Sequence, residues 1–275
     1  MKKKIVVGLT ASFLASATHA ALIDFNSAGD LANRFSLNTN NGNPVKFTQV
    51  MAGGLGNSGA VDYLPTTESD HTTAVFNEQS FSFENPGDSI TVSHFLLRQD
   101  ATAIQTPWTH LGITGDTSER LDAGSAENSY ASIRFEPVGG ALATDVFVRA
   151  ETKVNGGGRL RTTLSSPLSL DAGNWYFVST TFTFESNASI AVSTTLEDWG
   201  TDGSAFLSTL LEVPPTSIAN SGLDSVNGDG TVWGAFRDFN EGGANLSDNF
   251  SVIPEPTSLL AATLVFMIAA LRRRP

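Results

Sequence analysis

Residues 175–196 read WYFVSTTFTFESNASIAVSTTL, and this stretch decides the fold. Apolar side chains alternate with Ser and Thr in residues 175–184 and again in residues 189–196. A period of two is typical of a strand buried on one face, because successive side chains point to opposite faces. The polar break at residues 185–188 joins the two runs, so the stretch is predicted to form a β-hairpin.

Similar short runs follow one another from Ala21 onward, separated by turn residues such as those of Glu84–Asp88. They predict about a dozen strands, at spacings typical of a β-sandwich or barrel. Ser204–Leu211 carries enough Leu and Ala for a short helix, and it fits a further strand equally well. No Pro-rich or Ser-rich linker divides the middle of the chain, so residues 21–253 are predicted to form one domain.

Two further stretches narrow the fold class. Leu170–Val178 leads into the hairpin, and Asp248–Val252 supplies a closing strand. Together they resemble the concanavalin A-like, or laminin G-like, jelly roll, an all-β antiparallel sandwich. That resemblance implies that the first and last strands are neighbours, which would pair Leu22–Phe25 with Leu246–Val252. An immunoglobulin-like or carbohydrate-module sandwich of another topology is the alternative.

The N-terminus has the three parts of an export signal. Three lysines at residues 2–4 precede an apolar run from Ile5 to Ala17, and Thr18-His19-Ala20 ends in a small residue. This order predicts a signal helix over residues 1–20, cleaved between Ala20 and Ala21. An uncleaved membrane anchor is the alternative.

The C-terminus shows a second ordered pattern over residues 254–275. A Pro-Glu-Pro motif is followed by an uncharged apolar run from Leu259 to Leu271 and then by three arginines. The arginines mark a cytoplasmic side under the positive-inside rule, so the run is predicted to be a single short membrane helix. A short core helix is the alternative. The residues that carry the pattern are Pro254, Glu255, Pro256, Arg272, Arg273 and Arg274.

This tail resembles the PEP-CTERM sorting signal of Gram-negative bacteria. The resemblance implies that an exosortase, a membrane-embedded cysteine transpeptidase, recognises and processes the tail. The chain would then be inserted in the membrane transiently through its C-terminal helix. Its β domain would reach the cell surface or the extracellular space.

Composition restricts the class of partner. Between residues 21 and 253, 10 of the 16 Lys and Arg residues and 27 of the 28 Asp and Glu residues remain, a formal charge of −17. Such a field repels nucleic acid, and no basic stripe interrupts it, so no nucleic-acid partner is predicted. The absence of cysteine excludes thiolate zinc sites, iron–sulfur clusters and cysteine nucleophiles.

No catalytic motif is complete. Gly56–Gly59 is similar to a serine-nucleophile loop, but no histidine is marked as its base. Glu197 and Asp198 are adjacent, so on a strand they would point to opposite faces and would not flank one sugar bond. The His-Glu-x-x-His motif is absent. The chain is therefore predicted to be non-enzymatic; a secreted hydrolase acting on glycans is the alternative.

No metal or cofactor is predicted from a complete motif. Ser225–Gly230 matches the start of a calcium loop only in part, because Phe236 stands where a bidentate Glu is needed, so a turn is favoured. By analogy with related sandwiches, a structural calcium near the paired termini would use Asp24 or Asp248.

Exposed aromatic rings are the remaining signal for a ligand. A pyranose stacks on such rings, and three tryptophans lie near turn residues: Trp108, Trp199 and Trp233. Trp175 begins an alternating strand and is predicted to be buried. We take Trp199 and Trp233 as the candidate ligand-binding residues. The sequence thus predicts an exported surface or matrix protein that binds polysaccharide.

Overall fold

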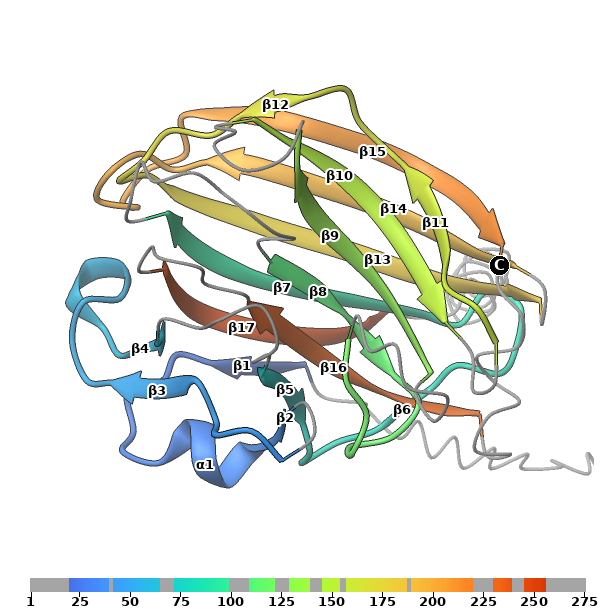
Figure 1. The fold of residues 1–275 in the computed structure, drawn as a ribbon, viewed down its shortest axis with the longest axis horizontal. Helices are drawn as coiled ribbons and strands as arrows, with labels where there is room; N and C mark the ends of the chain where they lie inside the picture. Colours follow the sequence, from blue (N-terminus) through green and yellow to red (C-terminus); the bar gives the residue numbers. More distant parts are fainter. Residues whose placement is uncertain are drawn as a thin grey trace, which may run out of the picture.

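The computed structural model describes residues 20–39, 42–64, 72–98, 109–121, 129–138, 145–153, 157–186, 189–219, 230–238 and 245–255. Outside them lie residues 1–19 of the predicted signal, residues 256–275 of the predicted tail, Trp108 and residues 225–229 of the predicted turn. In the described ranges, 17 strands form two antiparallel sheets packed face to face (Figure 1). The predicted all-β antiparallel sandwich is confirmed.

The first sheet has eight strands, with β1 paired to β17 beside the main path. Its order is β15 (Ser208–Ala219), β14 (Ser189–Asp198), β13 (Trp175–Ser186), β7 (Ser89–Arg98), β17 (Asn245–Glu255), β4 (Ala60–Tyr63) and β3 (Phe47–Val50), with β1 (Ala21–Ile23).

The second sheet has nine strands, with β12 paired to β10 and β6 paired to β16. Its order is β11 (Leu160–Thr163), β10 (Asp145–Lys153), β9 (Tyr130–Pro137), β8 (Thr109–Thr114), β16 (Thr231–Asp238), β5 (Thr72–Phe76) and β2 (Phe35–Thr39), with β12 (Leu168–Ser169) and β6 (Phe81–Ser82).

The hairpin at the centre of the sequence is confirmed. β13 and β14 pair along their lengths, from Tyr176 opposite Asp198 to Ser186 opposite Ser189. The stretch Ser204–Leu211 forms no helix, and its last four residues begin strand β15. Two short helical elements were not predicted. They are α1 (Asp30–Arg34), which lies beside β3 at one end of the molecule, and the 3-10 turn η1 (Leu55–Asn57) (Figure 1).

Phenylalanines fill the space between the sheets. The ring of Phe35 lies 5.5 Å from that of Phe236 and 5.4 Å from that of Phe250, so one ring from β2 meets rings from both sheets. These are the inward positions of alternating strands, as the sequence predicts. The buried phenylalanines of this core are Phe25, Phe35, Phe47, Phe76, Phe81, Phe83, Phe135, Phe182, Phe184, Phe236 and Phe250.

The chain's first and last described strands lie side by side. β1 pairs with β17, with Ala21 opposite Val252 and Ile23 opposite Phe250, which confirms the predicted pairing. β17 then continues past Val252, and Pro254 and Glu255 pair with Ile90 and Ser89 of β7. The sheet thus includes the first two residues of the Pro-Glu-Pro motif.

Candidate functional site

The outer face of the eight-stranded sheet carries an unusual run of hydroxyls. On β13, Val178 and Phe182 point into the core, so Ser179 and Thr181 point outward. The same alternation places Ser193 and Thr195 of β14, and every second residue of β7 from Ser89 to Ser93, on this face. We call the following set the hydroxyl face: Ser89, Thr91, Ser93, Ser179, Thr181, Thr183, Ser193, Thr195 and Ser251.

Strand register aligns these hydroxyls into hydrogen-bonded pairs. Thr91 Oγ1 and Thr181 Oγ1 lie 2.6 Å apart, and Ser89 Oγ and Thr183 Oγ1 lie 2.9 Å apart. Ser93 Oγ is 2.7 Å from Ser251 Oγ on β17. Each pair joins neighbouring strands and fixes two rotamers. The hydroxyl face is therefore an ordered array of groups that both donate and accept hydrogen bonds.

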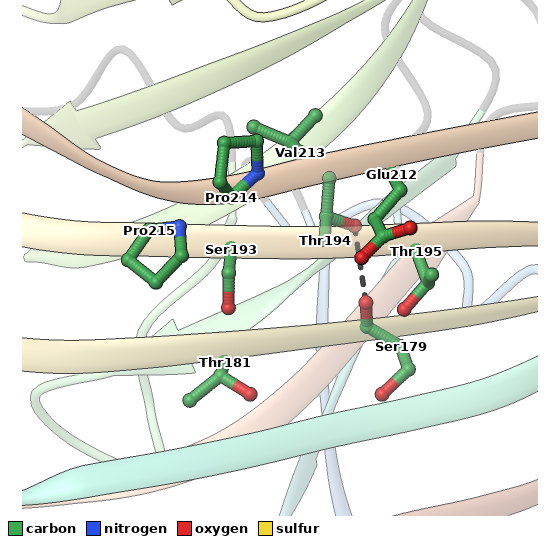
Figure 2. A pocket seen from close by; sticks show the side chains of 9 residues that line it. All are labelled: Ser179, Thr181, Ser193, Thr194, Thr195, Glu212, Val213, Pro214 and Pro215. Atoms are coloured by element: carbon green, nitrogen blue, oxygen red, sulfur yellow. Dashed lines mark hydrogen bonds between the residues drawn. The ribbon is translucent and has the colours of Figure 1, made fainter.

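A groove lies along one edge of the hydroxyl face (Figure 2). Its floor comes from β13 and β14, and its wall comes from β15, where Pro214 and Pro215 bulge out of register between Thr216 and Val213. The carboxylate of Glu212, opposite Thr195, lies at this wall (Figure 2). The residues that line the groove are Ser179, Thr181, Ser193, Thr194, Thr195, Glu212, Val213, Pro214 and Pro215.

Aromatic rings continue the same face beyond Ser179. Phe177 and Phe95 are paired across β13 and β7, and their ring centroids lie 4.8 Å apart. Trp199 stands edge-on to Phe95 at 5.2 Å and to Phe206 at 6.3 Å. Phe206 is 50% exposed, so the cluster has an outer edge in solvent. We call Phe95, Phe177, Trp199 and Phe206 the aromatic end.

One hydrogen bond orients the tryptophan of the aromatic end. Trp199 Nε1 donates to Glu197 Oε2 at 2.9 Å, and Glu197 is opposite Phe177 in the strand register. The indole is thereby held beside the carboxylate, and it keeps partial exposure. A half-exposed ring with a bonded polar edge is suited to stacking against a ligand.

The structure separates the two tryptophans that the sequence selects. Trp199 belongs to the aromatic end of the eight-stranded sheet, whereas Trp233 lies on the outer face of the nine-stranded sheet, against Tyr130 and Leu121. They do not form one binding surface. Trp175 is 3% exposed and packs with Leu246, as predicted for a buried residue.

Asp24 and Asp248, the carboxylates considered for calcium, are both engaged by protein donors. Asp248 Oδ2 accepts from Leu55 N at 2.9 Å and from Ser58 Oγ at 2.5 Å, and Asp24 accepts from the amide of Asn26. Burial raises the pKa of Asp248, while the hydrogen bond from Ser58 acts in the opposite direction. Within the described ranges, no three His, Asp or Glu side chains gather as a metal site.

In the part of the chain that the structure describes, which excludes His71, the serine of the Gly56–Gly59 loop is bonded to a carboxylate and not to a histidine. Ser58 Oγ donates to Asp248, and the buried ring of His94 has Nδ1 3.3 Å from the hydroxyl of Ser247 instead. Burial lowers the pKa of His94 to about 3. Ser58 and Asp248 stabilise the η1 turn through their hydrogen bonds, and His94 lies in the buried interior.

Sequence reasoning selected Trp199 and missed the rest of the face. The signal was present in part, because the outward positions of the central hairpin read Phe177, Ser179, Thr181 and Thr183. The partners Phe95 and Ser251 come from distant strands, and only the register brings them to the same face.

No protein-family model matches the sequence, and no curated protein matches it. Among solved structures, a peanut lectin with a bound 9-residue peptide is 13% identical, at a TM-score of 0.48 over 87% of this chain and 100% of that one. A GH43 glycoside hydrolase is 14% identical, at 0.50 over 92% and 42%. The globular domain of T. cruzi calreticulin is 8% identical, at 0.49 over 88% and 90%. At such identities the likeness concerns the fold alone.

Proposed function

We propose that the protein binds a neutral polysaccharide along the outer face of the eight-stranded sheet. The observation that carries this proposal is the continuity of the aromatic end with the hydroxyl face across β7, β13 and β14. Phe177 and Ser179 are neighbours on the same side of β13, so apolar and hydroxylated surfaces meet there. The ligand would lie across both.

The two halves of the face match the two surfaces of a sugar chain. The axial C–H groups of a pyranose pack on rings such as Trp199 and Phe206, and its hydroxyls bond to Ser and Thr. The aligned hydroxyls are already held by their cross-strand partners, so little side-chain entropy is lost on binding. An array of this kind favours an extended chain over a single buried sugar.

Binding is favoured over hydrolysis by the lining of the groove. Glu212 is the carboxylate among the residues that line it, whereas glycoside hydrolysis ordinarily uses two, a few ångströms apart. Glu197, on the neighbouring strand, is bonded to Trp199. The sandwich fold does not itself decide the matter, because unrelated activities share it.

We also propose that the domain acts outside the cytoplasmic membrane after exosortase processing. The signal-like N-terminus and the Pro-Glu-Pro, apolar and arginine zones of the C-terminus support this. In the part of the chain that the structure describes, no helix is long and apolar enough to cross a membrane. Intact mass of the protein from its host, with and without the exosortase, tests the proposal. A tail kept in both strains would overturn it.

Affinity electrophoresis in gels containing hydroxyethylcellulose, xylan or dextran tests the binding proposal. We expect at least one polymer to retard the wild type, and Trp199→Ala to weaken binding roughly tenfold, about 1.4 kcal/mol. Leu160→Ala is the control, since Leu160 is 43% exposed on β11 of the nine-stranded sheet, away from the proposed binding face, and loses apolar surface in the same way.

The hydroxyl face is tested with a matched pair of Thr→Val variants. Thr181→Val removes the hydroxyl that bonds to Thr91 and keeps the β-branched shape, so the strand stays formed. Thr163→Val makes the same change on the exposed strand β11 of the other sheet. Binding that is weakened by Thr181→Val and unchanged by Thr163→Val supports the site. Equal mobility of all four variants, or no retardation of the wild type by any polymer, would overturn it.

A further inference from the structure

A straight row of three polar groups crosses the groove on the outer face of the eight-stranded sheet. Strand register places Ser179 of β13 opposite Thr195 of β14, and Thr195 opposite Glu212 of β15. All three residues line the groove, and Figure 2 shows the side chain of Glu212 extending from β15 over β14. Since neighbouring strands lie about 4.8 Å apart, the row is about 10 Å long. We call these three residues the polar row.

The polar row can be reached by a ligand from solvent. Glu212 is exposed, and Ser179 and Thr195 are half-buried. The groove that they line has a volume of about 240 Å³. Pockets that enclose a whole small molecule have volumes of roughly 300–1,000 Å³. The groove is therefore suited to holding part of an extended chain that continues along the sheet.

Glu212 differs from the other glutamates in the strands of this sheet. Glu197 accepts a hydrogen bond from the indole of the aromatic end at 2.9 Å, and Glu185 accepts one from a serine hydroxyl of β15 at 2.6 Å. Glu255 accepts one from a threonine of the hydroxyl face at 3.0 Å. Among the described residues, no donor is bonded to the carboxylate of Glu212. Both of its oxygens are therefore available to the donors of a ligand.

The two hydroxyls of the polar row are available in the same way. Thr181 and Thr183 are bonded to hydroxyls of β7, whereas the side chains of Ser179 and Thr195 have no hydrogen-bond partner within the described ranges. A hydroxyl both donates and accepts hydrogen bonds, and an ionised carboxylate only accepts them. The polar row thus offers a ligand two groups of the first kind beside one of the second.

No basic side chain of these strands offsets the charge of Glu212. In the eight described strands of this sheet, Arg98 is the one Lys or Arg residue. Arg98 is 2% exposed and donates to the carbonyl oxygen of Leu170, so its charge does not reach the outer face. An anionic group in the groove would be repelled by the carboxylate, whereas a neutral hydroxyl would not.

Strand pairing and the proline bulge hold Glu212 at the wall of the groove. Glu212 and Thr195 are a cross-strand pair, so their Cβ atoms lie about 5 Å apart. The next residue, Val213, is 7% exposed and is paired with the buried Thr194. Pro214 follows, and its ring fixes the backbone angle φ. A slip of β15 by one residue would bury the carboxylate, so the register keeps Glu212 on the outer face.

We propose that Glu212 is the specificity-determining residue of the polysaccharide site. Its carboxylate accepts hydrogen bonds from adjacent hydroxyls of a neutral sugar, and it repels a sugar that carries carboxylate or sulfate. This inference rests on the function proposed above and adds the residue that selects the ligand. Ser179 and Thr195 bond to sugars of either class, so they contribute affinity without selectivity.

The test compares each neutral polymer with its carboxymethylated form, by affinity electrophoresis of the full-length chain. The pairs are hydroxyethylcellulose with carboxymethylcellulose, xylan with carboxymethyl xylan, and dextran with carboxymethyl dextran. We expect the neutral polymer that retards the wild type to bind at least tenfold more tightly than its carboxymethylated form. Added NaCl should reduce this ratio, because salt screens the repulsion between carboxylates.

Glu212→Gln keeps the shape of the side chain and removes its charge. The variant should lower the affinity for the neutral polymer at least threefold, because a carboxylate accepts stronger hydrogen bonds than an amide. It should also reduce the ratio between the neutral and the carboxymethylated polymer at least threefold, at an unchanged melting temperature. Glu78→Gln is the matched control, since it changes the net charge equally at a side chain that is 45% exposed and follows β5 of the other sheet.

Thr195→Val separates affinity from selectivity. It removes one hydroxyl of the polar row, so it should weaken binding of both forms of the polymer by the same factor and leave their ratio unchanged. Equal effects of Glu212→Gln and Glu78→Gln, on a neutral polymer that retards the wild type, would overturn the role of Glu212 and leave polysaccharide binding in place. If no neutral polymer retards the wild type, the proposed function is wrong and this inference is wrong with it.

Discussion

At the scale of single residues, His94 and Glu119 change stability with pH in opposite directions. Burial lowers the pKa of His94 from 6.5 to about 3, and burial raises the pKa of Glu119 from 4.5 to about 7. The stability that the folded chain gains from a neutral His94 is fully present above pH 6.5. It is lost as the pH falls below 6.5, because only the unfolded chain takes up the proton. The contribution of Glu119 is complete below pH 4.5 and is lost as the pH rises through 7.

Between pH 4.5 and 6.5 these two contributions oppose each other, so single variants should expose each one. Relative to the wild type, His94→Gln should lose stability as the pH rises, by about 2–3 kcal/mol across the window. Glu119→Gln should gain stability over the same window by a similar amount. Urea unfolding at pH 4.5, 5.5 and 6.5 measures both slopes. If the free energy of unfolding changed with pH by the same amount in the wild type and in both variants, neither group would titrate as its burial requires.

Residue-scale features were predictable where they depend on local pattern. The burial of Trp175 and the partial exposure of Trp199 follow from their places at the start of a strand and at a turn. The Ser93–Ser251 hydrogen bond joins residues 158 positions apart, so it needed the register.

At the scale of elements, β15 is a long edge strand with a built-in interruption. Val192 pairs with Thr216 and Thr194 pairs with Val213, which leaves Pro214 and Pro215 in a bulge. Proline has no N–H to offer, and bulges twist an edge away from partners. The two prolines therefore protect an edge that another chain could extend.

Replacing both prolines by threonine, as in Pro214→Thr/Pro215→Thr, should promote self-association. The variant restores two backbone donors and raises β propensity at an exposed edge. Light scattering against protein concentration should show larger species than the wild type forms. Thr209→Val, on the same strand, raises apolarity without adding a donor and serves as control. Matching curves for the double variant and the control would contradict this role for the prolines.

Elements with strong local chemistry were predictable, and those without it were not. The Glu84–Asp88 turn is confirmed, with Asp88 N bonded to Asn85 O at 2.9 Å and the Asp88 carboxylate accepting from the amides of Glu84 and Asn85. α1 has only five residues, and Gly29 caps it without a side-chain hydrogen bond. No periodic or capping signal marks so short a helix.

At the scale of the whole molecule, the last strand completes the first sheet. β17 lies between β7 and β4, also pairs with β1, and contributes Phe250 and Val252 to the core. Contacts of such sequence separation form late and cooperatively. The stability of the sandwich therefore depends on residues next to the predicted sorting tail, and the boundary between them has a measurable position.

Three truncations locate that boundary. A chain ending at Glu255 should keep the β-sheet circular dichroism spectrum and melt within about 3 °C of the full-length chain, because β17 is intact. Ending at Ile253 removes the strand pairs of Pro254 and Glu255 and the 3.0 Å hydrogen bond from Thr91 Oγ1 to Glu255, so we expect a loss of about 1 kcal/mol. Ending at Ala244 removes β17 and should abolish cooperative melting. If the chains ending at Ile253 and Glu255 are equally stable, the domain ends before the Pro-Glu-Pro motif, and an exosortase would find the whole motif outside the sheet.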